Sequence, residues 1–257
     1  MTDQDIKRGR EYLVVKDNEL IEKAQYHLTA TQQKLINYTI SLIKPEDTEF
    51  QKYEISVSDF CEICGIDKNH FYTEFKHIID NLDTKTLWIK TDTKLFKFRW
   101  FIKAEYLIDQ GKVRLMFDDD IKKYLIGLKK NFTKYPLSNI LPMRSKYSMR
   151  LYEKLKCHSR GRTIITKKYT LEELREAFEI EDTTYKEYKD FKKRVLEVAI
   201  EEINLYSDIT VSYEPIKNGR RIAELKFSIQ QKDSLDNYIA YKYGENKLDN
   251  KKQKYII

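Results

Sequence analysis

The chain has 257 residues, of which 41% are hydrophobic and 35% are charged, and it contains 7 glycines and 4 prolines. This composition is typical of a globular, helix-rich protein with one large or two ordinary domains, and it excludes the low-complexity and fibrous classes. The 48 basic side chains exceed the 41 acidic ones, and the resulting net charge of +7 favours an anionic partner.

An internal repeat organises the predicted elements. Residues 57–66 and 171–180 share their apolar positions, and each segment is predicted to form a short helix behind a capping residue. A leading helix precedes each short helix, and a longer amphipathic helix and then strands follow it. In chain order, the predicted ranges are 29–43, 57–66, 69–82 and 87–103 in the first copy and 145–156, 171–180, 185–205 and 209–229 in the second.

The strands of both copies are predicted to form hairpins. In the first copy, apolar residues from Phe96 to Ile102 alternate with basic ones, so one face of a strand over residues 95–103 is expected to be buried. In the second copy, Asn218 and Gly219 form the strongest short hairpin signal. Helix, short helix, long helix and hairpin in this order predict a winged helix. The sequence therefore predicts an α+β fold with two winged-helix domains in tandem.

The boundary between these domains is expected near residues 135–142, which lie between the copies and hold two of the four prolines. We expect an N-terminal domain at residues 1–136 and a C-terminal domain at residues 137–230. Residues 231–257 are polar and are expected to form a flexible tail.

Basic side chains are concentrated in the second copy. Residues 144–168 contain nine basic side chains and one acidic side chain, a net charge of +8. In helix-turn-helix docking, the N-terminal half of the recognition helix enters the major groove, and this half of the predicted helix 185–205 is rich in Lys and Arg. The C-terminal domain is therefore expected to be the main DNA-binding domain. The expected contacts are Arg144, Lys146, Lys186, Lys189, Lys192, Lys193, Arg194, Lys217, Arg220 and Arg221.

The contacts outside the long helix have different expected roles. Residues 217–221 at the hairpin tip are expected to lie beside the DNA backbone or in the minor groove. On the leading helix, Arg144, Lys146 and Lys154 are expected to contact phosphates. Arg150 is equally consistent with an internal ion pair to Glu153.

The N-terminal domain is nearly neutral, so its DNA contacts are expected to be auxiliary. The candidates are Lys68, Lys76, Lys97 and Arg99. Dimerisation through the apolar, aromatic-rich strands around residues 106–108 and 112–117 is an equally open role for this domain, and a packed core is the alternative for these strands.

Cys61 and Cys64, followed by His70 and His77, form the one metal-like constellation, because zinc binds two cysteines and two histidines in many small sites. The favoured interpretation is that both cysteines pack as small hydrophobic side chains, since they lie in a helix-like run. The histidines are also spaced more widely than in a zinc finger. No metal ion or other cofactor is therefore expected.

Enzyme chemistry is disfavoured by residue spacing. The glycines are too far apart for a phosphate-binding loop, a dinucleotide fingerprint or a nucleophile elbow. No two histidines have the spacing that a strand-nicking enzyme needs, and no clustered carboxylate motif suggests a metal-dependent nuclease. Three cysteines indicate a reducing compartment, and Met1 to Asp5 carry no export signal, so a cytoplasmic protein without a membrane segment is expected.

The sequence resembles the winged-helix replication initiators of iteron-containing plasmids over about residues 13–229. The segments that carry the resemblance are LVVKDNEL at 13–20, SKYSMRLYEKL at 145–155 and FKKRVLEVAIEEIN at 191–204, together with Tyr213 and the sequence KNGR at 217–220. Cys61, Cys64 and the tail have no counterpart in this pattern.

The resemblance implies a non-enzymatic initiator whose monomers bind directly repeated origin sites, bend the DNA and help to open an adjacent AT-rich segment for the host initiator and helicase. It implies that Lys189 to Arg194 read bases, and that Lys217, Arg220 and Arg221 hold the backbone. It also implies that dimers, paired through the first domain, repress the protein's own gene at an inverted repeat. A tandem winged-helix transcriptional regulator without origin activity is the alternative.

Overall fold

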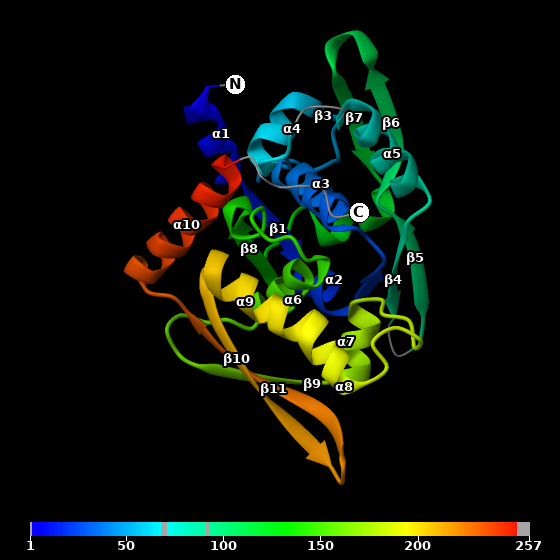
Figure 1. The fold of residues 1–257 in the computed structure, drawn as a ribbon. Helices are drawn as coiled ribbons and strands as arrows, with labels where there is room; N and C mark the ends of the chain where they lie inside the picture. Colours follow the sequence, from blue (N-terminus) through cyan, green and yellow to red (C-terminus); the bar gives the residue numbers. More distant parts are fainter. Residues whose placement is uncertain (1, 68–70, 91–92, 251–257) are drawn as a thin grey trace.

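The computed structural model describes residues 2–67, 71–90 and 93–250 (Figure 1). Two successive units each run in the order helix, strand, short helix, long helix and strands. This order confirms the predicted α+β fold class and the internal repeat. No helix within the described ranges is both long and apolar enough to cross a lipid bilayer.

The first unit holds three antiparallel sheets, which are the pair β1-β8, the sheet β2-β4-β5 and the sheet β3-β7-β6. Its helices are α1 (Asp3–Arg10), α2 (Asn18–Lys23), α3 (Ala30–Ser41), α4 (Val57–Cys64) and α5 (Phe71–Asp83). Its strands are β1 (Leu13–Asp17), β2 (Ala24–Tyr26), β3 (Tyr53–Ser56), β4 (Thr86–Lys90), β5 (Leu95–Arg99), β6 (Phe101–Leu107), β7 (Lys112–Phe117) and β8 (Phe132–Pro136).

Local sequence signals set the ends of the helices in this unit. Thr29 and Gln32 form a capping box at the start of α3. The hydroxyl of Ser56 accepts a hydrogen bond from the amide of Asp59 at 3.2 Å and caps α4. Helix α4 ends at Gly65, whose φ of +63° is a left-handed conformation that favours glycine. The predicted short helix and its N-terminal capping residue are thus confirmed.

The predicted strand over residues 95–103 is wrong, because it is two strands in different sheets. Strand β5 ends at Arg99 and β6 begins at Phe101. Trp100 between them is 1% exposed and packs edge-on against Tyr26, with ring centroids 5.3 Å apart. The bend exchanges the two faces, so Phe101 is buried and Ile102, which alternation placed in the core, is 49% exposed.

The second unit contains α6 (Lys146–Lys156), β9 (Ile165–Thr170), α7 (Leu171–Ala177), α8 (Tyr188–Phe191), α9 (Glu197–Tyr206), β10 (Ile209–Asn218), β11 (Arg221–Gln231) and α10 (Ser234–Asp249). A π-helical turn at Lys192–Leu196 joins α8 to α9, and we call the continuous segment 188–206 the long helix. The strands pair antiparallel in the order β10-β11-β9. The hairpin of β10 and β11, which we call the wing, extends beyond the body of the molecule (Figure 1).

Helix α6 packs against both units, with α9 on one side and α3 of the first unit on another. Lys16 of β1 and Glu153 of α6 form a buried ion pair, with Nζ and Oε1 2.6 Å apart and side chains no more than 3% exposed. Arg150 lies 3.8 Å from the other carboxylate oxygen, and the hydroxyl of Tyr135 also donates to Glu153. Because buried charges need partners, this network fixes α6 to the first unit.

Residues 137–143 connect the units through the protein interior rather than as an exposed linker. Leu137, Ile140, Leu141 and Met143 are fully buried. Proline in this segment favours an exposed linker, but the apolar side chains of the segment are buried and add to the core. A continuous exposed stretch follows later, at residues 160–164 between α6 and β9.

The expected flexible tail is wrong for residues 234–249, because they form helix α10 and pack onto the rest of the protein. The carboxylate of Asp233 caps α10 by accepting a hydrogen bond from the amide of Asp236 at 2.8 Å. Arg10 of α1 is 2% exposed and pairs with Glu245 and Asp249, each at 2.9 Å. The contacts of α10 with the rest of the protein and its buried ion pair with Arg10 therefore hold this polar segment in place. Residues 251–257 lie outside the described residues.

Candidate nucleic-acid interface

Asn204, near the end of the long helix, forms two hydrogen bonds with the base of the wing. The side-chain amide of Asn204 donates to the carbonyl oxygen of Val211 at 2.9 Å, and its oxygen accepts from the Val211 amide at 2.7 Å. Val211 is 2% exposed and lies in the buried end of β10. These two bonds satisfy backbone groups that the sheet leaves unpaired, and they set the position of the wing relative to the helix.

The long helix has one buried face and one basic face. Phe191, Val195, Ala199 and Ile203 are at most 2% exposed and pack into the core. Lys189, Lys192, Lys193 and Arg194 are exposed in the N-terminal half. The ammonium of Lys192 lies 3.5 Å from Glu197, whereas no carboxylate of the described residues lies within 4 Å of Lys189, Lys193 or Arg194. The structure thus brings these predicted cations together on the exposed side of one helix.

Lys186 lies outside the helix, because the helix begins at Tyr188 and not at Tyr185 as predicted. Tyr185 has a φ of +48° and ends an irregular turn. Arg175 of α7 holds this turn by donating to the carbonyl oxygens of Glu181, Thr184 and Tyr185 at 2.8 to 3.0 Å. Sequence reasoning did not identify Arg175, since its partners are backbone carbonyls that carry no residue signature.

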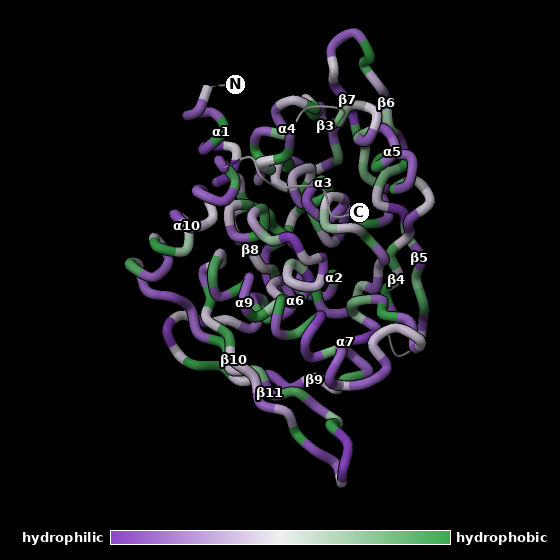
Figure 2. Tube along the Cα trace, viewed as in Figure 1, coloured by the Kyte–Doolittle hydropathy of each residue, from purple (hydrophilic) through white to green (hydrophobic). Residues whose placement is uncertain are grey.

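The wing tip carries the other predicted cations. Lys217, Arg220 and Arg221 are exposed around the turn at Gly219, whose φ is +61°. Residues 218 and 221 face each other as the last pair of the hairpin, which confirms the predicted turn. The distal end of the wing is mostly hydrophilic and stands clear of the body (Figure 2).

The two cations at the start of α6 differ in exposure. Arg144 is exposed, and its backbone amide donates to Glu202 at 2.8 Å. Lys146 is half-buried, with its ammonium 5.2 Å from the centre of the Tyr147 ring. Burial lowers the pKa of Lys146, with Glu179 opposing that shift. Arg144 is therefore the more accessible of the two.

The expected phosphate contact of Lys154 is wrong. Lys154 is 3% exposed, and its ammonium donates to the side chain of Glu22 at 2.8 Å and to the Glu22 carbonyl oxygen at 2.9 Å. Arg150 is 2% exposed and lies in the Glu153 network, so the internal ion pair is the confirmed alternative. Both cations lie on the face of α6 that packs against the first unit, which a count of charge along the sequence does not distinguish from the exposed face.

The auxiliary candidates of the first unit lie on two elements. Lys97 and Arg99 are exposed two residues apart on β5, and Lys97 lies over the Trp88 ring at 4.9 Å. Lys76 is exposed on α5 and pairs with Asp80 at 2.7 Å. Lys68 lies outside the described residues.

The strands considered for dimerisation divide between core and edge. Strand β7 is central in the sheet β3-β7-β6, and Val113, Leu115 and Phe117 are fully buried, as expected for a packed core. Strand β6 is an edge of that sheet. Ile102 on it and Ile108 after it are 49% and 87% exposed.

Cys61 and Cys64 lie in the core of the first unit, which confirms the packing interpretation. They are 1% and 0% exposed on α4, and burial raises the pKa of the Cys64 thiol to about 12. His77 is exposed on α5, and His70 lies outside the described residues.

A cleft of about 400 Å³ between the units adds cations that sequence reasoning missed. Lys23 and Lys90 line it from the first unit, and Lys167 and Lys168 line it from β9 of the second. Glu173 and Glu176 of α7 also line it, so its charge is mixed. Lys167 and Lys168 lie within the basic window 144–168, but their position opposite Lys90 depends on the tertiary fold.

The fold places this protein in the class of tandem winged-helix proteins. In its second unit, exposed cations lie on the long helix and on the wing. The family model described as "Initiator Replication protein, WH1" matches residues 13–156, and the model described as "Initiator Rep protein, WH2" matches residues 170–229. The chain therefore belongs to the family of initiator replication proteins, which confirms the family indicated by its sequence motifs.

Two relatives and one solved structure are similar to this chain. A "Replication initiation protein" of Escherichia coli is 29% identical over 239 residues, which cover 88% of this chain and 72% of the relative. An "Uncharacterized 27.6 kDa protein" of Escherichia coli is 22% identical over 80% of this chain and 91% of the relative. The crystal structure of the Pi initiator protein in complex with iteron DNA has a similar fold, with a TM-score of 0.72 at 20% identity. That match covers 88% of this chain and 99% of the Pi chain.

Proposed function

We propose that this chain is the replication initiator of a plasmid and that its monomers bind directly repeated origin sites, or iterons. Family membership supports the initiator role. The similar fold of the Pi initiator, which was solved with iteron DNA, supports the kind of site. The observation that carries the proposal is the set of exposed cations on the long helix and at the wing tip. These two elements bind the groove and the flanking backbone in winged-helix docking.

The cations have distinct proposed roles. Lys189, Lys193 and Arg194 read base edges in the major groove, because exposed Lys and Arg near the start of a recognition helix can pair with guanine. Lys217, Arg220 and Arg221 neutralise phosphates beside the groove. In the remaining set, each member supplies phosphate contacts that fix the register without reading sequence. This set comprises Arg144, Lys146, Lys186, Lys192 and the auxiliary residues Lys68, Lys76, Lys97 and Arg99.

Origin opening then follows from binding rather than from a chemical step of this protein. Smooth bending of a site by 40–90° costs on the order of 1–6 kcal/mol, which contacts from both winged helices offset. Strain in the bent duplex helps an adjacent AT-rich segment to open, where the host initiator and helicase load.

Autoregulation is proposed to use a dimer formed through the first unit, which represses the protein's own gene at an inverted repeat. Strand β6 supports this role, because an edge strand has unpaired backbone groups that a second copy can pair with. Replacing Ile102 with Lys, near the start of β6, is expected to shift the balance towards monomer in analytical ultracentrifugation. Replacing Leu95 of β5, which is also exposed, with Lys is expected to leave that balance unchanged, and a loss of dimer in that control would place the interface elsewhere.

The test is fluorescence anisotropy of the full-length protein over a salt series, with labelled duplexes that tile the DNA around its own gene and scrambled duplexes as competitors. Tight, competitor-resistant binding to short direct repeats is the expected result. A plasmid that carries those repeats should then replicate only when the protein is supplied. Binding confined to a promoter operator, with no replication from the cloned region, would contradict the initiator role and favour a transcriptional regulator.

A further inference from the structure

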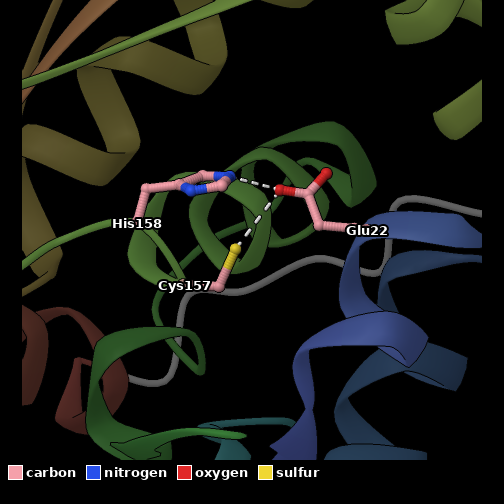
Figure 3. Close-up of side chains that lie close together, drawn as sticks. All are labelled: Glu22, Cys157 and His158. Atoms are coloured by element: carbon pink, nitrogen blue, oxygen red, sulfur yellow. Dashed lines mark hydrogen bonds and ion pairs between the residues drawn. The ribbon is translucent and has the colours of Figure 1, made fainter. Parts of the chain in front are cut away.

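Three ligand-type side chains converge between α2 and the C-terminal end of α6. Glu22 comes from α2 of the first unit, Cys157 is the C-cap residue of α6, and His158 follows it. Figure 3 shows the thiol of Cys157 and the ring of His158 directed at the same carboxylate oxygen of Glu22. That oxygen lies 3.3 Å from Sγ of Cys157 and 2.5 Å from Nε2 of His158. The hydroxyl of Tyr169 on β9 donates to it at 2.8 Å.

The donor set and its spacing match a zinc site. Thiolate sulfur, imidazole nitrogen and carboxylate oxygen are the three protein ligand types of zinc, and three protein ligands with an open fourth position are a known arrangement. All three ligand atoms lie within 4.8 Å of one another. Zinc bonds of about 2.0–2.3 Å in tetrahedral geometry require ligand atoms roughly 3.3–3.6 Å apart. A small separation of the imidazole from the carboxylate therefore makes room for the ion.

We propose that Glu22, Cys157 and His158 bind a Zn²⁺ ion, with a water molecule in the fourth position. Binding forms bonds from zinc to the sulfur, the imidazole nitrogen and one carboxylate oxygen, and it releases the thiol proton to solvent. The ion with one thiolate and one carboxylate is neutral overall, so it does not repel the nearby ammonium of Lys154. Lys154 donates to the other carboxylate oxygen of Glu22 at 2.8 Å and orients that ligand from outside the site.

The site has a structural consequence that does not depend on DNA binding. Its ligands join α2 of the first unit to the start of the connection that leads into β9 of the second. The side chains of Glu22 and His158 are 24% and 27% exposed, so a metal ion can enter from solvent. Zinc would therefore fasten the connection between the winged helices to the first of them. Cys61 and Cys64 cannot supply this site, because they are buried in the core on α4.

The test is an anaerobic titration of the full-length, reduced protein with Co²⁺ as a spectroscopic probe, followed by competition with Zn²⁺. We expect one ion per chain, a thiolate-to-cobalt charge-transfer band and the d–d absorption of a tetrahedral centre. Cys157→Ser should abolish the charge-transfer band, and His158→Asn should weaken zinc affinity by more than about 100-fold, since loss of an outer partner alone costs about 10–100-fold. Zinc should raise the Tm of the wild type and not that of His158→Asn.

Matched controls keep the proposal open to refutation. His77→Asn changes an exposed histidine outside the cluster, and Cys61→Ser changes a cysteine of the core, so both should keep the cobalt spectrum. Circular dichroism of each variant checks that it is folded. The proposal is overturned if the wild type gives no tetrahedral cobalt spectrum and no zinc-dependent Tm shift. It is also overturned if the spectrum survives in a folded Cys157→Ser variant or disappears in a folded Cys61→Ser variant.

Discussion

The side chain of Asn204 and the backbone of Val211 form a reciprocal pair of hydrogen bonds, at 2.9 and 2.7 Å, between the end of the long helix and the start of the wing. Both elements carry the cations to which we assign DNA contacts. The geometry of those cations relative to one another therefore depends on a residue that has no charge and that contacts no DNA in our proposal.

Replacing Asn204 with Ala should lower the free energy of unfolding by about 1–3 kcal/mol, because a buried backbone amide and carbonyl lose their partners. Urea denaturation followed by circular dichroism measures this loss. Thr210→Ala, an exposed change on the same strand, is the control and should unfold at the wild-type urea concentration. An unchanged midpoint for Asn204→Ala would mean that water replaces both bonds.

Replacing Arg194 with Ala should weaken binding to the specific site by about 1–3 kcal/mol more than binding to random DNA, because a base contact is lost. Competition anisotropy on both duplexes gives the two affinities. Lys242→Ala removes an exposed cation of α10 and should leave the specificity ratio unchanged. An equal loss on both duplexes would remove Arg194 from the base-reading set.

Replacing Arg221 with Ala should lower affinity on all duplexes alike and reduce the slope of log affinity against log salt by about one unit, as expected for one lost phosphate contact. The measurement is the same anisotropy titration at several salt concentrations. If the slope does not change, the wing tip does not contact the DNA backbone through this residue.

Replacing Arg10 with Ala should destabilise the protein by about 3–5 kcal/mol, because it leaves Glu245 buried without its partner. Thermal unfolding measures the loss, and limited proteolysis should cut α10 sooner than in the wild type. Arg8→Ala, an exposed change on the same helix, is the matched control. Wild-type stability of Arg10→Ala would show that α10 is held by its apolar contacts alone.

Lys247 should make stability rise between about pH 8 and pH 10.5. Burial lowers the pKa of Lys247 to about 8 in the folded protein, from an ordinary value of 10.5, although Glu202 opposes the shift. Between these values the unfolded chain binds more protons than the folded one, so deprotonation favours folding as the pH increases. Urea midpoints of wild type and Lys247→Gln at pH 7 and pH 9.5 test this. The wild type should gain stability relative to the variant, and a constant difference would contradict the shift.

Much of the fold could be predicted because its signals are local. Ser56 and Gly65 mark the two ends of one helix within ten residues, and Asn218 with Gly219 marks the wing turn. The exposed cations of the long helix follow from its 3.6-residue period, since the buried positions leave the basic ones outside. These elements need no knowledge of distant contacts.

The errors concern residues whose partners are far away in the sequence. Lys154 pairs with Glu22 across 132 residues, and Arg10 pairs with Glu245 across 235 residues. No sequence motif relates residues this far apart. The sequence therefore predicted a phosphate contact for Lys154 and a flexible tail in place of α10. The single strand predicted over residues 95–103 has a different cause of error. Period-two alternation cannot indicate that the chain bends at Trp100 from one sheet into another.

Helix α10 follows the second unit in the chain but also packs against the first. A methyl group at Gly65 would lie 2.5 Å from the carbonyl oxygen of Leu248, so the turn after α4 accepts α10 only as glycine. On its other side α10 contacts α9 of the second unit. The two winged helices are therefore joined twice, once by the chain that connects them and once by the contacts that α10 makes with both. Two connections restrict the relative orientation of the winged helices more than one connection would. Less orientational entropy is therefore lost when both winged helices bind one rigid target.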